Sequence, residues 1–247
     1  MVGRGSARGV RAGAGRALMF LLAGGLLAGC GGPAAKTAPK GPKPVANANP
    51  ARPSAPTMTA HYCTPSGVKA ACWGKAAFQP VATNMAGAMP SGFSASFAAV
   101  WNGKALFLLQ KVKNPKGISN QVNPKAPWTT DAMEAYISGS NSGGATLGTH
   151  ETQFVVPAAQ PANIWHLNGR SATGVKAAVT KTSSGYDTLL TVPWSDLGTT
   201  AGTGQRIGLD VAADAFSGKG QNQMLAWGIH GSSEQAPASW GQVTLAK

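Results

Sequence analysis

Residues 95–113 read Ala-Ser-Phe-Ala-Ala-Val-Trp-Asn-Gly-Lys-Ala-Leu-Phe-Leu-Leu-Gln-Lys-Val-Lys. The pair Asn102-Gly103, which is the strongest short signal for a hairpin turn, separates two runs of apolar and aromatic residues. In the same way, Ser183-Ser-Gly185 separates Val175–Lys181 from Tyr186–Val192. The sequence therefore predicts antiparallel hairpins and an all-β fold.

Similar short segments, rich in β-branched and aromatic residues, recur between Gly, Asn, Ser and Pro up to the C-terminus. No stretch after residue 60 keeps a helical apolar period, although Pro193–Leu197 fits one helical turn. About ten antiparallel strands predict one β-sandwich or jelly roll over residues 59–247, which is long enough for a proper core. The predicted strands are 75–81, 95–101, 105–113, 131–138, 152–156, 175–181, 186–193, 207–215, 223–230 and 241–246.

The N-terminus has the pattern of a secretory signal peptide over residues 1–29. Four arginines and no acidic residue precede an apolar run, Leu18–Gly29, that is too short to span a bilayer. The run ends in Leu27-Ala-Gly-Cys30, which resembles the bacterial lipobox and predicts cleavage before Cys30 and lipidation of its thiol. The alternative is an ordinary signal peptide with an incidental cysteine.

Residues 30–58 consist of Pro, Ala, Lys, Gly and Asn with almost no large apolar side chain. Such a segment cannot bury enough surface to offset its ordering entropy, so we expect a disordered tether. The sequence thus predicts an extracytoplasmic lipoprotein, anchored in the outer membrane or at the cell surface, whose single domain is a monomer.

The net charge of +13 alone would suggest a nucleic-acid partner, but the positions of the charged residues argue against one. Four basic residues lie in the signal peptide and four in the tether, while all eight acidic residues follow residue 60. The predicted domain therefore carries +5 without a Lys/Arg cluster. Export also argues against a nucleic-acid partner.

With Cys30 assigned to lipid, Cys63 and Cys72 remain. In an oxidising compartment this pair predicts a small disulfide loop at the N-terminal edge of the domain. A metal site that includes His61 is the alternative, but a second pair of ligands is missing. We expect no metal and no cofactor.

Catalytic patterns are largely absent from the sequence. His150-Glu151 begins like the zinc-protease motif, but Phe154 stands where the second histidine is required. The chain has no G-x-S-x-G elbow, no phosphate-binding Gly-rich loop and no C-x-x-C-H. Asp131 and Glu134 are three residues apart, so in a strand they face opposite sides. The sequence predicts that the domain is not an enzyme.

Six motifs follow one another along residues 75–245, and in form and order they resemble family 9 carbohydrate-binding modules. They are Phe97–Leu108, Pro127–Ile137 with the pattern W-x-x-D-x-x-E, Gln153-Phe154-Val155, Gly185–Trp194, Ile207–Val211 and Trp240–Leu245. The resemblance implies a β-sandwich that holds a poly- or oligosaccharide between aromatic rings. The apolar C–H face of a sugar packs on a ring while placed polar groups bind its hydroxyls.

By the match of motifs, Trp128 is a stacking ring, Glu134 accepts a bond from a sugar hydroxyl and Gln153 is a further polar contact. For each residue a structural role is the alternative: core packing, a salt bridge to a lysine, or a bond to the neighbouring backbone. Trp101, Trp194 and Phe107 are assigned to the core or to structural corners.

The chain departs from the family at two places. Val155 stands where the family often has a sugar-binding arginine, and the loop Gly231–Ser239 has no aromatic residue. The resemblance then leaves Trp240, or less favourably Trp227, as the second stacking ring, and the remaining alternative is that the chain has no second stacking ring.

Two other functions remain open from the sequence. One is a haem or electron-transfer module that would use Met133, Met224 or His230. The other is a structural or partner-binding lipoprotein whose sugar site has decayed.

Overall fold

The computed structural model describes residues 55–64, 68, 70–141, 143–167, 172–220, 223–228 and 236–247. All of them belong to the compact unit Ala48–Lys247. The predicted signal peptide, Cys30 and the tether up to residue 54 lie outside the described residues. Within the described ranges, no helix is long and apolar enough to cross a membrane.

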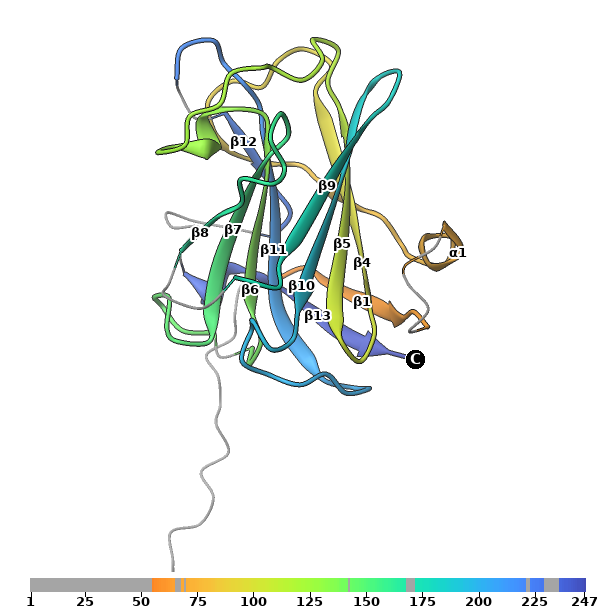
Figure 1. The fold of residues 1–247 in the computed structure, drawn as a ribbon. Coiled ribbons are helices and arrows are strands. Elements are labelled where there is room, and N and C mark those ends of the chain that lie inside the picture. The colour runs from red at the N-terminus through yellow and green to blue at the C-terminus, as the bar shows by residue number, and fades with distance from the viewer. Residues whose placement is uncertain are drawn as a thin grey trace, which may run out of the picture. The chain divides into compact units, whose positions relative to one another are not determined.

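The described part of the chain is almost entirely β-structure (Figure 1). The strands are β1 (Thr57–Tyr62), β2 (Gln79–Val81), β3 (Thr83–Ala86), β4 (Ser94–Trp101), β5 (Ala105–Lys113), β6 (Ala132–Ser138), β7 (Glu151–Pro157), β8 (Trp165–Leu167), β9 (Lys176–Lys181), β10 (Gly185–Pro193), β11 (Arg206–Asp214), β12 (Met224–Ala226) and β13 (Gly241–Ala246). One short α-helix, α1 (Ala70–Trp73), and two 3-10 helices, η1 (Pro127–Thr129) and η2 (Pro237–Ser239), complete it. The predicted all-β sandwich is confirmed.

The strands follow one path in the order β8-β7-β6-β11-β13-β1-β4-β5-β10-β9. β12 pairs with β11 and with β3, and β2 pairs with β4. We call β8, β7, β6, β11, β12 and β3 the first half-sheet, and β2, β4, β5, β10 and β9 the second. The pairings of β1 with β13 and with β4 are parallel, so not every pair is antiparallel as predicted.

One hydrophobic core lies between the two half-sheets. Alternate residues of β6 and β11 (Met133, Ala135, Ile137, Ile207, Leu209, Val211) and of β4, β5 and β10 (Phe97, Ala99, Leu106, Leu108, Leu190, Val192) are buried together in it. Gln110 also reaches across the core, and its Nε2 donates to the carbonyl oxygen of Ala212 at 2.9 Å. This period-two burial is the pattern that the hairpin sequences predicted.

Both predicted hairpins form. Residues 94–101 of β4 pair antiparallel with β5 around Asn102-Gly103, and β9 pairs antiparallel with β10 around Ser183-Ser184. Pro193–Leu197 forms the predicted turn, in which the N–H of Asp196 donates to the carbonyl of Pro193 at 3.0 Å.

Trp101 and Trp194 are buried and anchor corners through their ring N–H groups, which donate to the carbonyls of Ala246 (2.9 Å) and Asn102 (2.8 Å). Phe107, by contrast, is half-buried and does not belong to the core. It pairs with Val100 and Thr191, on the face of β5 opposite to Leu106 and Leu108. The assignment of Phe107 to the core was therefore wrong.

The N-terminal edge of the domain differs from the prediction. β1 begins at Thr57, so the predicted boundary between tether and domain, at residues 58 and 59, cuts through a strand. Met58 and Ala60 of this strand are buried in the core. The predicted strand 75–81 is reduced to Gln79–Val81, because only these residues pair with β4.

Cys63 and Cys72 form a disulfide, with 5.7 Å between their Cα atoms. The bridge fastens the segment that carries α1 to the end of β1, as the cysteine count predicted. Because both sulfur atoms are used in the bond, the alternative metal site with His61 has lost its thiolate ligands.

We expect the double variant Cys63→Ser/Cys72→Ser to lower the free energy of unfolding by about 2–3 kcal/mol, since the bridge closes a short loop and restricts the unfolded chain. Denaturation in urea of the oxidised wild type and of the variant measures the difference. Reduced wild type is the control and should match the variant. Equal midpoints for all three would contradict the prediction.

Candidate functional site

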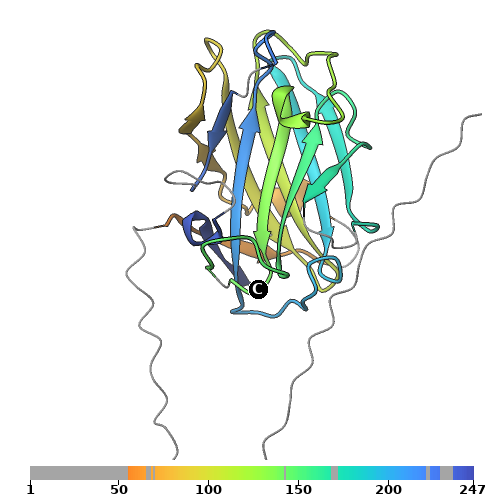
Figure 2. The same ribbon diagram turned by 90° about the vertical axis from the view of Figure 1, so that its left-hand side faces the viewer.

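Trp128 lies in η1, where Pro127 starts the turn and the N–H of Thr130 closes it on the carbonyl of Pro127 at 3.2 Å. Figure 2, in which β11, β6, β7 and β8 face the viewer, shows η1 at the edge of the sheet where β6 begins and β7 ends. The ring of Trp128 is half-buried and meets the ring of Trp165 edge to face, with 5.3 Å between the centroids and 73° between the planes. The predicted stacking ring therefore has an aromatic neighbour that the sequence did not suggest.

A row of directly paired residues leads from this aromatic pair across the first half-sheet. Trp165 of β8 pairs with Val155 of β7, and Val155 pairs with Glu134 of β6. Directly paired residues place their side chains on the same face of a sheet. This face is the outer one, because Met133 and Ala135 on either side of Glu134 point into the core. Val155, which replaces the family's arginine, thus lies between Glu134 and Trp165.

Glu134 and Gln153 are brought together, as the resemblance implied, but they bind one another. Gln153 Nε2 donates to Glu134 Oε2 at 2.7 Å and also lies 3.3 Å from the hydroxyl oxygen of Tyr136. The Tyr136 hydroxyl donates to the same carboxylate oxygen of Glu134. Glu134 is 2 % exposed and Gln153 5 %, so this cluster is a buried polar network. Neither a lysine salt bridge for Glu134 nor a purely backbone role for Gln153 accounts for these contacts.

Asp214, at the end of β11, is a second acid beside this network. It is fully buried, and its pKa is raised well above the ordinary value by loss of solvent and then by the carboxylates of Glu134 and Asp131. Neither oxygen of Asp214 has a hydrogen-bond partner among the described residues. Burial beside other carboxylates disfavours the charged form of this acid.

Asp131, in the middle of the W-x-x-D-x-x-E motif, is a structural clamp. Its carboxylate accepts bonds from the Asn114 amide (3.1 Å) and from the backbone N–H groups of Ser119 (2.7 Å) and Phe216 (3.1 Å). Burial raises its pKa, and the two backbone donors oppose that shift. Asp131 therefore joins two loops, the one after β5 and the one after β11, at the end of the sandwich that carries Trp128. Its charge also reaches Asp214, so the sequence argument, which kept Asp131 and Glu134 apart, overlooked the acid that both influence.

Trp240, predicted as the second stacking ring, is fully buried. Its ring lies 5.8 Å from that of Tyr136 at a tilt of 48° and belongs to a second apolar cluster on the outer face, with Met224 and Ala226 of β12. No face of this ring is open to a ligand in the structure. Trp227, the less favoured choice, is 7 % exposed and packs against Phe97 at 5.1 Å. Residues 231–235 of the loop without an aromatic lie outside the described residues.

The residues proposed for haem do not converge. Met133 points into the main core, whereas Met224 belongs to the cluster on the outer face of the same half-sheet. His230 lies outside the described residues. Within the described ranges, no group of three or more His, Cys, Asp or Glu side chains could hold a metal ion.

Asp210 lies in β11 on the same face as Asp214, and its buried carboxylate is surrounded by backbone N–H groups. It accepts bonds from the N–H groups of Trp227 (3.2 Å) and Gly228 (2.9 Å). Glycine is needed at 228, because a Cβ there would lie 2.7 Å from Oδ2 of Asp210. Burial raises the pKa of Asp210 to about 7, against the opposing effect of these N–H groups.

This shift predicts a pH dependence of stability. The folded protein holds the Asp210 proton up to about pH 7, whereas the unfolded chain releases it near the ordinary value of 3.8. Since the folded state binds more protons in that window, Asp210 should make the free energy of unfolding fall as the pH rises from 4 to 7, with a contribution of at most about 1.4 kcal/mol per pH unit from this one group. Urea denaturation at half-unit steps measures the slope. Asp210→Asn should make the slope less steep, while the raised pKa values of Asp131 and Asp214 keep their own part of it. An equal slope in wild type and variant would contradict the assignment.

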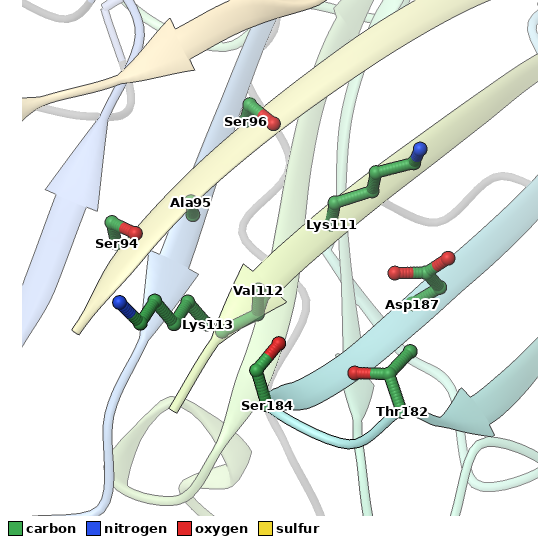
Figure 3. Close-up of a pocket in the computed structure, with 9 residues that line it drawn as sticks. All are labelled: Ser94, Ala95, Ser96, Lys111, Val112, Lys113, Thr182, Ser184 and Asp187. Atoms are coloured by element: carbon green, nitrogen blue, oxygen red, sulfur yellow. The ribbon is translucent and has the colours of Figure 1, made fainter. Parts of the chain in front are cut away.

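A separate hollow of about 410 Å³ lies on the outer face of the second half-sheet (Figure 3). Lys111, Lys113 and Asp187 line it together with the hydroxyls of Ser94, Ser96, Thr182 and Ser184. No aromatic ring lines it and none of the predicted site residues is near it, so it lacks the surface on which a sugar ring would stack.

Three residues of the site were missed by sequence reasoning: Tyr136, Trp165 and Asp214. Tyr136 could have been found, because a residue two positions after Glu134 in a strand shares its face. Asp214 could have been placed on the same face as Asp210 by the same rule. Trp165 could not have been found from the sequence, because its pairing with Val155 depends on the conformation of the loop between β7 and β8.

Comparison with known proteins shows three similarities. Residues 66–247 match the family described as "Carbohydrate family 9 binding domain-like". The "Exoglucanase XynX" of Acetivibrio thermocellus is 22% identical over 158 residues, which are 63% of this chain and only 13% of that enzyme. A family 9 carbohydrate-binding module from Caldicellulosiruptor kristjanssonii, solved with cellotriose, superposes with a TM-score of 0.64 at 15% identity and covers 77% of this chain and 93% of its own. The same kind of module solved with glucose gives 0.63 at 14% identity, over 77% and 96% of the two chains.

Proposed function

Because the chain belongs to the carbohydrate family 9 binding domain-like family, we propose that its sandwich is a non-catalytic module that binds poly- or oligosaccharide. The chain spans about an eighth of the length of its exoglucanase relative, whose activity is not carried over. The acids Glu134 and Asp214 are both buried, so neither carboxyl group is exposed to attack a glycosidic bond.

One observation carries the proposal: the half-buried ring of Trp128 lies at the edge of the sheet face that holds Glu134 and Gln153. The flat ring offers an apolar surface to the C–H groups of a sugar. The carboxylate and amide offer an acceptor and a donor for hydroxyls once a ligand replaces part of their mutual bonding. Trp240 is buried, so the second aromatic contact that the resemblance implied must come from another ring.

The experiment is binding of the full chain to a glycan array, followed by calorimetry with glucose and cellotriose, the sugars in the two solved relatives. The proposal expects saturable binding to at least one of these sugars. Absence of binding to both sugars and to every neutral glycan of the array would overturn it, and the structural or partner-binding function would then stand.

We further propose that the module is a monomer held outside the cytoplasm, at the outer membrane or cell surface, by lipid on Cys30. The support is the sequence Leu27-Ala-Gly-Cys30 after a basic and apolar signal, together with the disulfide Cys63–Cys72, which forms in oxidising compartments. The net charge of the domain, +5 without a Lys/Arg cluster, supports a partner other than nucleic acid.

Cys30→Ala is expected to abolish incorporation of labelled palmitate and to leave an uncleaved precursor that stays in the aqueous phase of a detergent partition. The wild-type chain, in the same host, should be labelled and partition into detergent. Labelling of the Cys30→Ala variant would show that the lipobox assignment is wrong.

A further inference from the structure

Trp165 lies at the edge of the first half-sheet, in the same row as Val155 and Glu134. Its ring is half-buried and touches that of Trp128 edge to face. An edge-to-face pair cannot sandwich one sugar between its members, because the two planes are far from parallel. Each ring therefore has to offer its own surface to a ligand.

Trp165 also lines a cavity of about 190 Å³ that does not include Trp128. Three prolines (Pro124, Pro127 and Pro157), Val122 and Ile164 form its apolar walls, and Asn163 is its polar member. The volume is below the roughly 300–1,000 Å³ of sites for drug-sized ligands, which suits a single monosaccharide ring.

The chemistry of these walls selects a neutral ligand. None of the seven described lining residues carries a charge, in contrast to the lysine- and aspartate-lined hollow of Figure 3. The Asn163 amide is oriented by its Nδ2, which donates to Oε1 of Gln160 at 2.6 Å. No donor among the described residues reaches its Oδ1, so this oxygen can accept a bond from a hydroxyl.

Pro127 lies between the ring of Trp128 and the cavity beside Trp165, because it lines this cavity and directly precedes Trp128. A chain of linked sugars that starts on Trp128 would reach the cavity with its next ring. We propose that Trp165 and Asn163 form a second subsite, which takes the adjoining ring of a neutral gluco-oligosaccharide. This inference rests on the proposed function and adds a preference for oligosaccharides over monosaccharides.

Calorimetry on the full chain with glucose and with cellotriose tests it. Wild type should bind cellotriose at least tenfold more tightly than glucose. Trp165→Ala and Asn163→Ala should each remove most of that advantage and change the affinity for glucose less than threefold. Asn163→Ala leaves the ring pair in place, and Trp165→Phe, which keeps a ring, should retain part of the advantage. Lys113→Ala, in the hollow of the second half-sheet, is the matched control and should change nothing.

The outcomes separate the two proposals. If Trp128→Ala abolishes binding of both sugars but the Trp165 and Asn163 variants keep the wild-type ratio, the second subsite is overturned and the proposed function stands. A wild-type ratio near one also overturns it. If wild type binds neither sugar, both proposals fail for neutral glucans. Circular dichroism melting of each variant excludes loss of the fold as the cause of a lost affinity.

Discussion

Trp128→Ala is expected to weaken sugar binding at least about thirtyfold, because loss of a ring at the centre of a small site typically costs 2 kcal/mol or more. The ring is half-buried against Trp165, so part of its surface is open to a ligand. For the same reason, its removal should lower the free energy of unfolding by less than the roughly 3–5 kcal/mol of a fully buried tryptophan.

Calorimetry with the best-bound glycan and urea denaturation must be done on the same variant. Trp73→Ala is the matched control, since Trp73 is also half-buried but lies in α1, beside β4 of the other half-sheet. It should lose a similar stability and no affinity. A large loss of stability in Trp128→Ala would make the residue structural, and unchanged affinity would remove it from the site.

Trp240→Ala is expected to have the opposite signature, with a loss of about 3–5 kcal/mol of stability. The ring is among the largest fully buried side chains and packs on Tyr136, whose hydroxyl is bonded to Glu134. Its removal should leave a cavity that cannot close easily, because Gly241 immediately after it is held in a ladder with Leu209.

Thermal and urea denaturation measure this effect, and Trp240→Phe, which keeps a ring, should recover part of the loss. If Trp240→Ala kept its stability within about 1 kcal/mol and lost sugar binding, Trp240 would be a ligand contact, as the motif resemblance implied, and the burial described above would not hold in solution.

The fold was largely predictable because its signals are local. The Asn102-Gly103 and Ser183–Gly185 turns and the alternating apolar residues around them define strands without knowledge of distant contacts. The elements that were missed are short or marginal: β1, β3, β8 and the helix α1. β8 has three residues, too few for a period to mark it in the sequence, and among the described strands it pairs with β7.

The candidate site was predictable only in part. The spacing of Trp128, Asp131 and Glu134 identified the segment, and the structure brings Gln153 to Glu134 as the resemblance implied. The motif resemblance assigned Trp240 the role of a stacking ring, whereas the exposure of a ring depends on which segments cover that face of the sheet. The burial of Asp214 near Glu134 had no signal in the sequence, because it depends on the pairing of β11 with β6.

By itself, then, the sequence determined the all-β class, the two main hairpins, the Cys63–Cys72 bridge and the family, since all of these depend on residue type and on spacing along the chain. Only the tertiary structure decided that Trp165 stands beside Trp128, that Trp240 is enclosed and that Asp131 joins the loops after β5 and β11. These facts depend on strand register across long loops and on the packing of distant segments. Neither is encoded in the local alternation of polar and apolar residues, because that alternation fixes the face of a side chain but not its neighbours.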